Sequence, residues 1–114
     1  MGDLSAHFSS GEFIDRRTGE RRDPPEELLR LLERIRALRP GPLVIVSGYR
    51  SPSTNALVGG APRSRHLQGD AADIPAGRAT AAEALRCGAV GIGVSDGWVT
   101  HVDVRPGWPV QWRY

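Results

Sequence analysis

Two residue types that bind metals well, His66 and Asp73, lie seven positions apart in the stretch SRHLQGDAADI at 64–74. Both side chains are costly to bury unless they are paired or bound to a metal. Small residues between them, Gly69 among them, leave room for backbone turns, and the spacing is not that of a helical HExxH site. We therefore expect a loop that enters a strand and brings both side chains toward one point.

A second histidine and carboxylate, His101 and Asp103, stand two positions apart in THVDVR. In a strand, side chains at i and i+2 share a face. Two histidines and one carboxylate that met there would leave a fourth tetrahedral position open for water, which is the composition of a catalytic zinc site. The alternative is that His101 is a core histidine that is hydrogen-bonded within the sheet.

Helices are expected where apolar residues recur at helical spacing between start and stop signals. The clearest helix begins at the prolines of DPPEELLRLLERIRALRPG and stops at Pro40-Gly41; its apolar face consists of Leu28, Leu31, Leu32, Ile35 and Leu38. A second helix starts at Ser51, and a third, built of small residues, ends at Gly88. None of the three carries a chemical motif.

Strands are expected at three β-branched runs, PLVIVSGYR at 42–50, VGIGV at 90–94 and WVTHVDV at 98–104. The first should be buried, and the aromatic tail GWPVQWRY should cover an edge of the core. Strands separated by helices without a regular βαβ repeat predict an α+β fold, with a small antiparallel sheet flanked by helices.

Length and composition narrow the class of protein. A chain of 114 residues suits a single domain over 1–114. It contains no apolar run of about 18 residues that could span a membrane, and its first residues lack the pattern of a secretory signal, so we expect synthesis in the cytoplasm. The single cysteine, Cys87, excludes an internal disulfide and favours a buried thiol.

The charged residues do not indicate a nucleic-acid partner. All 15 basic residues are arginines, against 13 acidic residues, and the net charge is +2. The arginines are dispersed and are not interleaved with aromatic residues, as stacking platforms for nucleic acids require. We therefore attribute the charge to solubility and weak steering of a substrate.

The segments SGYRSPSTNALVGGAPRSRHLQGDAADI and GIGVSDGWVTHVDVR together resemble the zinc D-Ala-D-Ala carboxypeptidase and murein peptidase superfamily, which has the Hedgehog/DD-peptidase fold. The family pattern is a serine, a histidine two residues later, a glycine and an aspartate three and seven after that histidine, and a second histidine near the C-terminus. Ser64, His66, Gly69, Asp73 and His101 occupy these positions. The resemblance implies one Zn²⁺ per chain, held by His66, Asp73 and His101, and is greatest to the compact bacterial or phage endolysin-like branch.

The resemblance also implies roles for residues near the metal. Arg50 matches the family arginine that contacts substrate near the scissile carbonyl, where a guanidinium stabilises an oxyanion or binds a carboxylate. The alternative is a surface ion pair. Ser64 is expected to orient the loop or a substrate group, and Tyr49 and Trp98 to line the cleft and bind substrate.

The general base departs from the family pattern. Many relatives carry a glutamate or aspartate three residues before the second histidine, where this chain has Trp98. The nearest acids are Asp96 and Asp103. We predict Asp103 as the catalytic base, because strand periodicity places it on the face of His101. Two alternatives remain open, namely that Asp96 is the base and that Asp103 orients a histidine ligand.

The function expected from the resemblance is hydrolysis of a peptide bond in the peptidoglycan stem or cross-link by a monomer that acts on the cell wall after release. Carboxypeptidase and endopeptidase activities both fit the motifs. Two rival functions are a zinc-bearing binding module that has lost hydrolysis and a structural phage-tail component that contacts the wall without cutting it.

Overall fold

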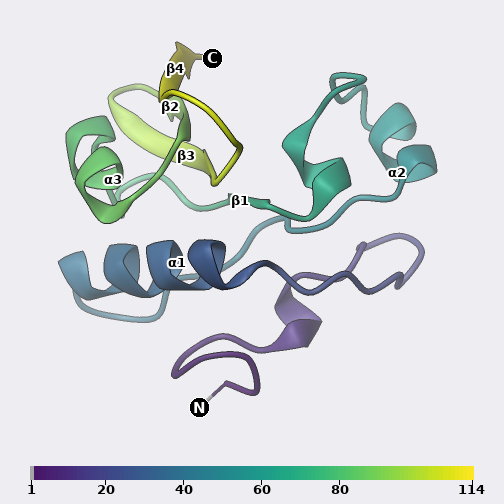
Figure 1. The fold of residues 1–114 in the computed structure, drawn as a ribbon, viewed down its shortest axis with the longest axis horizontal. Helices are drawn as coiled ribbons and strands as arrows, with labels where there is room; N and C mark the ends of the chain where they lie inside the picture. Colours follow the sequence, from purple (N-terminus) through teal and green to yellow (C-terminus); the bar gives the residue numbers. More distant parts are fainter. Residues whose placement is uncertain (1) are drawn as a thin grey trace.

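The computed structural model describes residues 2–114, and within them a four-stranded sheet joins the segments that carry the candidate site residues (Figure 1). The strands lie in the order β1-β3-β2-β4; their bounds are β1 Ala71–Asp73, β2 Gly91–Ser95, β3 Trp98–Asp103 and β4 Val110–Arg113. The pairs β1–β3 and β2–β3 are antiparallel, whereas β2–β4 is parallel. The α+β class is confirmed, but the sheet is mixed where we expected an antiparallel one, because the tail returns across the sheet as a fourth strand.

The longest helix, α1 at Glu26–Leu38, supports the sheet through its apolar face. Four of the five expected core residues are buried, namely Leu28, Leu31, Leu32 and Ile35, and they join the main hydrophobic cluster. Leu38 lies in the last turn and is 38 % exposed. Pro25 takes the position before the first helical residue, where its fixed φ suits the helix start.

Two shorter helices begin at capping hydroxyl residues, and the second of them ends at the expected glycine. Ser51 caps α2 at Pro52–Leu57 by accepting a hydrogen bond from the Thr54 N–H. The third helix, α3 at Ala81–Cys87, has a capping box at its start and ends at Gly88, whose φ of 109° lies in the left-handed region. Figure 1 shows α3 with β2 and β3 to one side of β1, and α2 to the other.

The expected buried strand at 42–50 does not form. The segment alternates buried Leu43 and Ile45 with Val44 and Val46, which are 57 % and 55 % exposed. Its only ladder contact is an isolated bridge between Ser47 and Asp73 at the end of β1. Continued in antiparallel register, this bridge would oppose Ile45 with Pro75, which has no N–H to donate, and the Ile45 carbonyl instead accepts from Arg16 Nη2.

Two 3-10 turns complete the described secondary structure, η1 at Ser10–Glu12 and η2 at Arg65–Gln68. The second turn begins at Ser64, whose hydroxyl accepts a hydrogen bond from the His66 N–H, and ends at Gly69 with a φ of 74°. A left-handed residue there turns the chain into β1, as the small residues of this stretch predict. None of the helices formed by residues 2–114 has the length and hydropathy of a membrane span.

Candidate metal centre

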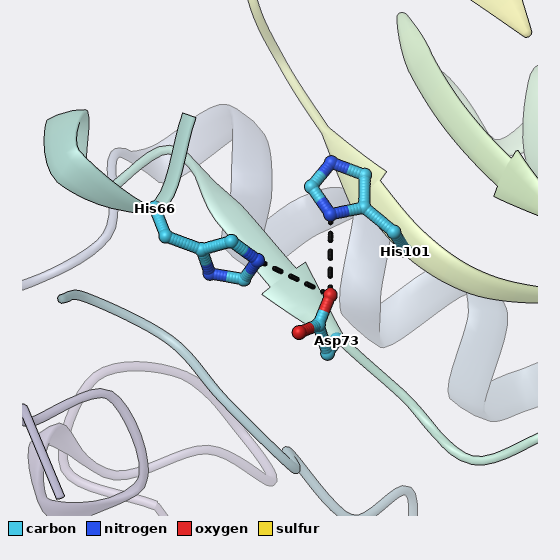
Figure 2. A group of neighbouring side chains, drawn as sticks. All are labelled: His66, Asp73 and His101. Atoms are coloured by element: carbon cyan, nitrogen blue, oxygen red, sulfur yellow. Dashed lines mark hydrogen bonds and ion pairs between the residues drawn. The ribbon is translucent and has the colours of Figure 1, made fainter. Parts of the chain in front are cut away.

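Three side chains from separate elements meet at one point. Asp73 and His101 are directly opposed in the antiparallel register of β1 and β3, so their side chains share one face of the sheet. His66 reaches the same point from η2. One ligand atom from each of the three residues lies within 4.8 Å of the others. Figure 2 shows both imidazole rings directed at the Asp73 carboxylate.

The outer hydrogen bonds of the two histidines determine which ring nitrogen is free. His66 Nδ1 lies 2.7 Å from the Gly48 carbonyl oxygen, which can only accept, so Nδ1 donates and Nε2 keeps its lone pair. His101 Nε2 donates to Asp103 Oδ2 over 2.8 Å, which leaves the lone pair on Nδ1. The two free nitrogens, His66 Nε2 and His101 Nδ1, lie 3.1 and 3.2 Å from Asp73 Oδ1.

This donor set fits zinc. When both rings are neutral, two nitrogen lone pairs and a carboxylate oxygen face one another and repel, unless a metal ion lies among them or a proton on a ring turns the contact into a hydrogen bond. The two histidines are only 2 % and 5 % exposed, whereas the Asp73 side chain is 27 % exposed and opens to the space in front of the rings. Two imidazoles and one carboxylate are also the three protein ligands of many catalytic zinc sites.

The surrounding hydrogen bonds keep the carboxylate ionised. Burial alone would raise the pKa of Asp73, but hydrogen bonds with His101 and His66 outweigh it and hold that pKa well below its ordinary range. For His101, burial lowers the pKa, but hydrogen bonds to Asp103 and Asp73 raise it above the ordinary histidine value. The site therefore carries a fixed negative charge and favours a cation.

Asp103 lies on the opposite side of His101 from Asp73. Its side chain is fully buried, and besides His101 it contacts the guanidinium of Arg105 at 2.7 and 2.9 Å. Burial would raise the pKa of Asp103, but these hydrogen bonds, first that from Arg105, hold it well below the ordinary range. Asp103 therefore contacts His101 through the ring nitrogen that faces away from Asp73, which is the contact that the orienting alternative requires.

The three ligand candidates line an open cleft of about 770 Å³. Arg50 and Ser64 line it too, as expected. Arg50 Nη2 lies 3.2 Å from Asp73 Oδ2, and its Nη1 donates to Asn55 Oδ1 over 3.3 Å. Arg50 therefore stands next to the ligand candidates, at the wall of the space where a substrate would enter.

The aromatic residues at the cleft are not the expected ones. Tyr49 and Trp98 do not line it, and Trp98 instead packs against the guanidinium of Arg39, at 5.2 Å from the ring centroid. Trp112 and Tyr114 line the cleft in their place. Their alternation in the tail, at i and i+2, is a strand signal that could have predicted a shared face.

The positions of the aspartates decide which of them could act as a general base in the cleft. Among residues 2–114, Asp73 is the only acidic side chain that lines the cleft. Asp96, the alternative base, is exposed in the β2–β3 turn with a φ of 49°. Neither acid considered as base, Asp96 or Asp103, therefore faces the space beside the ligand candidates.

Comparison with known protein families identifies the family of this chain. The model of a family described as Peptidase M15 matches residues 6–103, which span η2, β1, β2 and β3 and therefore all three ligand candidates. No curated protein matches the chain. The chain belongs to the peptidase M15 family, whose members are zinc-dependent metallopeptidases.

Proposed function

We propose that this chain is a zinc-dependent peptidase that hydrolyses a peptide bond in the peptidoglycan stem or cross-link, with one zinc ion held by His66, Asp73 and His101. The observation that carries the proposal is the convergence of these three ligand atoms within 4.8 Å at the wall of an open cleft. Membership of the peptidase M15 family supports the reaction class. The proposed catalytic unit is one domain, residues 1–114, acting as a monomer.

The residues around the metal have separate tasks in this proposal. A zinc ion bound there would polarise the scissile carbonyl and activate a water molecule for attack. Ser64 holds the backbone of His66 at the start of η2. Arg50 presents a cation beside Asp73, where it stabilises negative charge that develops on the carbonyl oxygen.

We assign Asp103 to orientation of His101. A base must lie within hydrogen-bond reach of the water it deprotonates, whereas Asp103 is fully buried behind the His101 ring. A carboxylate that accepts from the outer nitrogen of a histidine ligand fixes its tautomer and ring orientation. This geometry favours the orienting role over the base that we predicted from strand periodicity.

One observation favours a second candidate function, a zinc-bearing binding module without hydrolysis. In the part of the chain that the structure describes, the cleft has no acidic side chain besides Asp73 to accept a proton. Such a module would bind the same stem peptide and leave it uncut. The two functions differ only in turnover, so metal binding cannot distinguish them.

Digestion of purified peptidoglycan by the zinc-loaded protein tests the proposal. Mass spectrometry of the released muropeptides should show new products, and the bond cut distinguishes carboxypeptidase from endopeptidase activity. His66→Ala and chelator-treated protein serve as controls and should release none. Zinc bound at one ion per chain without any new product would refute the peptidase and support the binding module.

A further inference from the structure

The Asp103 carboxylate is held in place by a second residue, Arg105. The guanidinium donates through Nε to Oδ1 over 2.9 Å and through Nη2 to Oδ2 over 2.7 Å, and the Arg105 N–H also donates to Oδ1 over 3.1 Å. Two parallel charged hydrogen bonds fix the plane of a carboxylate as well as its position. The oxygen that accepts from His101 Nε2 is therefore one of the two gripped by Arg105.

The backbone of β2 at Gly91 restricts the position of the Asp103 carboxylate. The Gly91 N–H donates to Oδ1 over 3.0 Å, and a Cβ built at Gly91 would lie only 2.2 Å from Oδ2. Any larger residue at Gly91 would push the carboxylate away from His101. The pocket for Asp103 is thus closed below by β2 and on its outer side by Arg105.

Arg105 is itself held by the C-terminal strand. Its guanidinium carbon lies 5.2 Å from the centroid of the Trp112 ring, a cation–π contact. The same ring lies 5.1 Å from the His101 ring. Arg105, Asp103 and His101 form a connected series of contacts, and Trp112 packs against its first and last members, Arg105 and His101.

We propose that Arg105 is a positioning residue for the metal centre, which it serves by fixing Asp103 so that His101 keeps its proton on Nε2 and directs the Nδ1 lone pair at Asp73. This rests on the proposed function only in taking His101 as a metal ligand. Arg105 is well suited to the task, because a planar guanidinium grips both carboxylate oxygens, which an ammonium group cannot do.

An alternative role for Arg105 is to bind an anionic group of the substrate, since it also lines the cleft. Two of its three nitrogens are already engaged by Asp103, and one face of the guanidinium lies against Trp112. The geometry thus favours a role for Arg105 in holding Asp103 over a role in binding substrate. The two roles differ in what they affect: positioning changes zinc affinity, whereas substrate binding changes KM alone.

The test compares Arg105→Gln and Arg105→Lys with Arg113→Gln, a control at an exposed position of β4. Zinc affinity is measured by competition with a chelator. Arg105→Gln should weaken zinc binding by at most about 10- to 100-fold, the loss expected when a histidine ligand loses its own hydrogen-bond partner. Arg105→Lys should restore only part of the loss, and Arg113→Gln should bind zinc like the wild type.

A second measurement needs no metal and no activity. The ¹⁵N resonances of His101 in the metal-free protein, recorded at a pH where a ¹⁵N titration of each variant shows the ring to be neutral, report which ring nitrogen carries the proton. The wild type should show the proton on Nε2, and Arg105→Gln a mixture of both tautomers. This readout also applies to Arg105→Lys, should the glutamine variant fail to fold.

Two results would overturn the proposal. One is wild-type zinc affinity and an unchanged His101 tautomer in folded Arg105→Gln, and the other is an effect confined to KM. Failure of the proposed function would look different, because a protein that cuts no peptidoglycan would still show the Arg105-dependent tautomer and zinc affinity.

Discussion

At the scale of single residues, Asp73 determines what the site can do. It is the only acidic side chain that lines the cleft in the described residues, and three cationic or polar side chains are directed at it, His66, His101 and Arg50. Arg50 and the two histidines contact different oxygens of its carboxylate. One oxygen is therefore available to a metal while the other remains paired with the arginine.

Asp103→Asn separates orientation of His101 from proton transfer. An asparagine fills the same pocket but can present its NH₂ group to His101 Nε2, which would favour the wrong tautomer. We expect zinc affinity to fall by about 10- to 100-fold and hydrolysis to fall with it. Chelator competition and peptidoglycan digestion should be measured on the same sample, with exposed Asp23→Asn as the control. Full zinc affinity with lost hydrolysis would instead restore Asp103 as the base.

Arg50→Lys tests the proposed contact with the reacting carbonyl. Lysine keeps the positive charge but cannot contact Asp73, Asn55 and a substrate oxygen from one planar group. We expect kcat/KM to fall by at least about tenfold while zinc content stays at one ion per chain. An unchanged kcat/KM would reduce Arg50 to a structural partner of Asp73.

The ligand candidates, Arg50 and Ser64 could be predicted from the sequence, whereas the aromatic lining of the cleft was not. The cost of burying histidine and aspartate marks these residues as candidates, and the family pattern selects His66, Asp73 and His101 among them. The role of Trp98 depends on which neighbour its ring packs against, and Arg39, which it contacts, lies far away in the sequence. The sequence also could not show which ring nitrogen of His101 Asp103 contacts. The i, i+2 spacing predicts that the two side chains share a strand face, but not on which side of the imidazole ring the carboxylate lies.

At the scale of elements, the C-terminal strand changes the site most. The tail was expected to cover an edge of the core, but β4 pairs in parallel with β2 and places Trp112 and Tyr114 at the cleft. Gly93 makes this possible, because a Cβ there would lie 2.9 Å from Trp112 and from Tyr114. The helices were predictable from local capping and periodicity, whereas β4 depends on a distant pairing partner.

The loop before α1 is tied to α2 by one buried acid, Asp15. Its carboxylate is fully buried and accepts hydrogen bonds from the backbone N–H groups of Arg17, Thr18 and Ser51 and from the Thr54 hydroxyl. Burial would raise the pKa of Asp15, but these hydrogen bonds, first that from Ser51, hold it well below its ordinary range. The charged form therefore stabilises the folded state.

Asp15→Asn should lower the free energy of unfolding by about 2 kcal/mol at neutral pH, since the amide NH₂ would face the Ser51 N–H donor. Because the folded pKa of Asp15 is depressed, its contribution is complete above the unfolded value of about 3.9 and is lost as the pH falls below it. The difference between wild type and variant should therefore shrink on acidification. Urea unfolding across this range measures it, with exposed Asp96→Asn as the control; a constant difference would contradict the assignment.

At the scale of the whole molecule, the site ties together segments that are distant in the sequence. The radius of gyration of 13.0 Å is that of one compact domain of this length, which supports the proposed single domain. Asp73 and His101 are 28 residues apart, and His66 comes from a third element. A metal held by all three would bind the folded chain and not the unfolded one, so it should stabilise the entire fold.

Removal of zinc should therefore lower the melting temperature. A ligand at about 100 times its Kd contributes about 2.7 kcal/mol, or roughly 10 °C in Tm for a domain of this size. Calorimetry with and without a chelator should show this shift in the wild type and in His7→Ala, because His7 is paired with Glu33 outside the cleft. His66→Ala and His101→Ala should show no shift, since each removes one ligand of three. A full chelator-dependent shift in either variant would mean that the metal binds elsewhere in the chain. Asp73 would then be a hydrogen-bond partner of the histidines and of Arg50 and not a metal ligand.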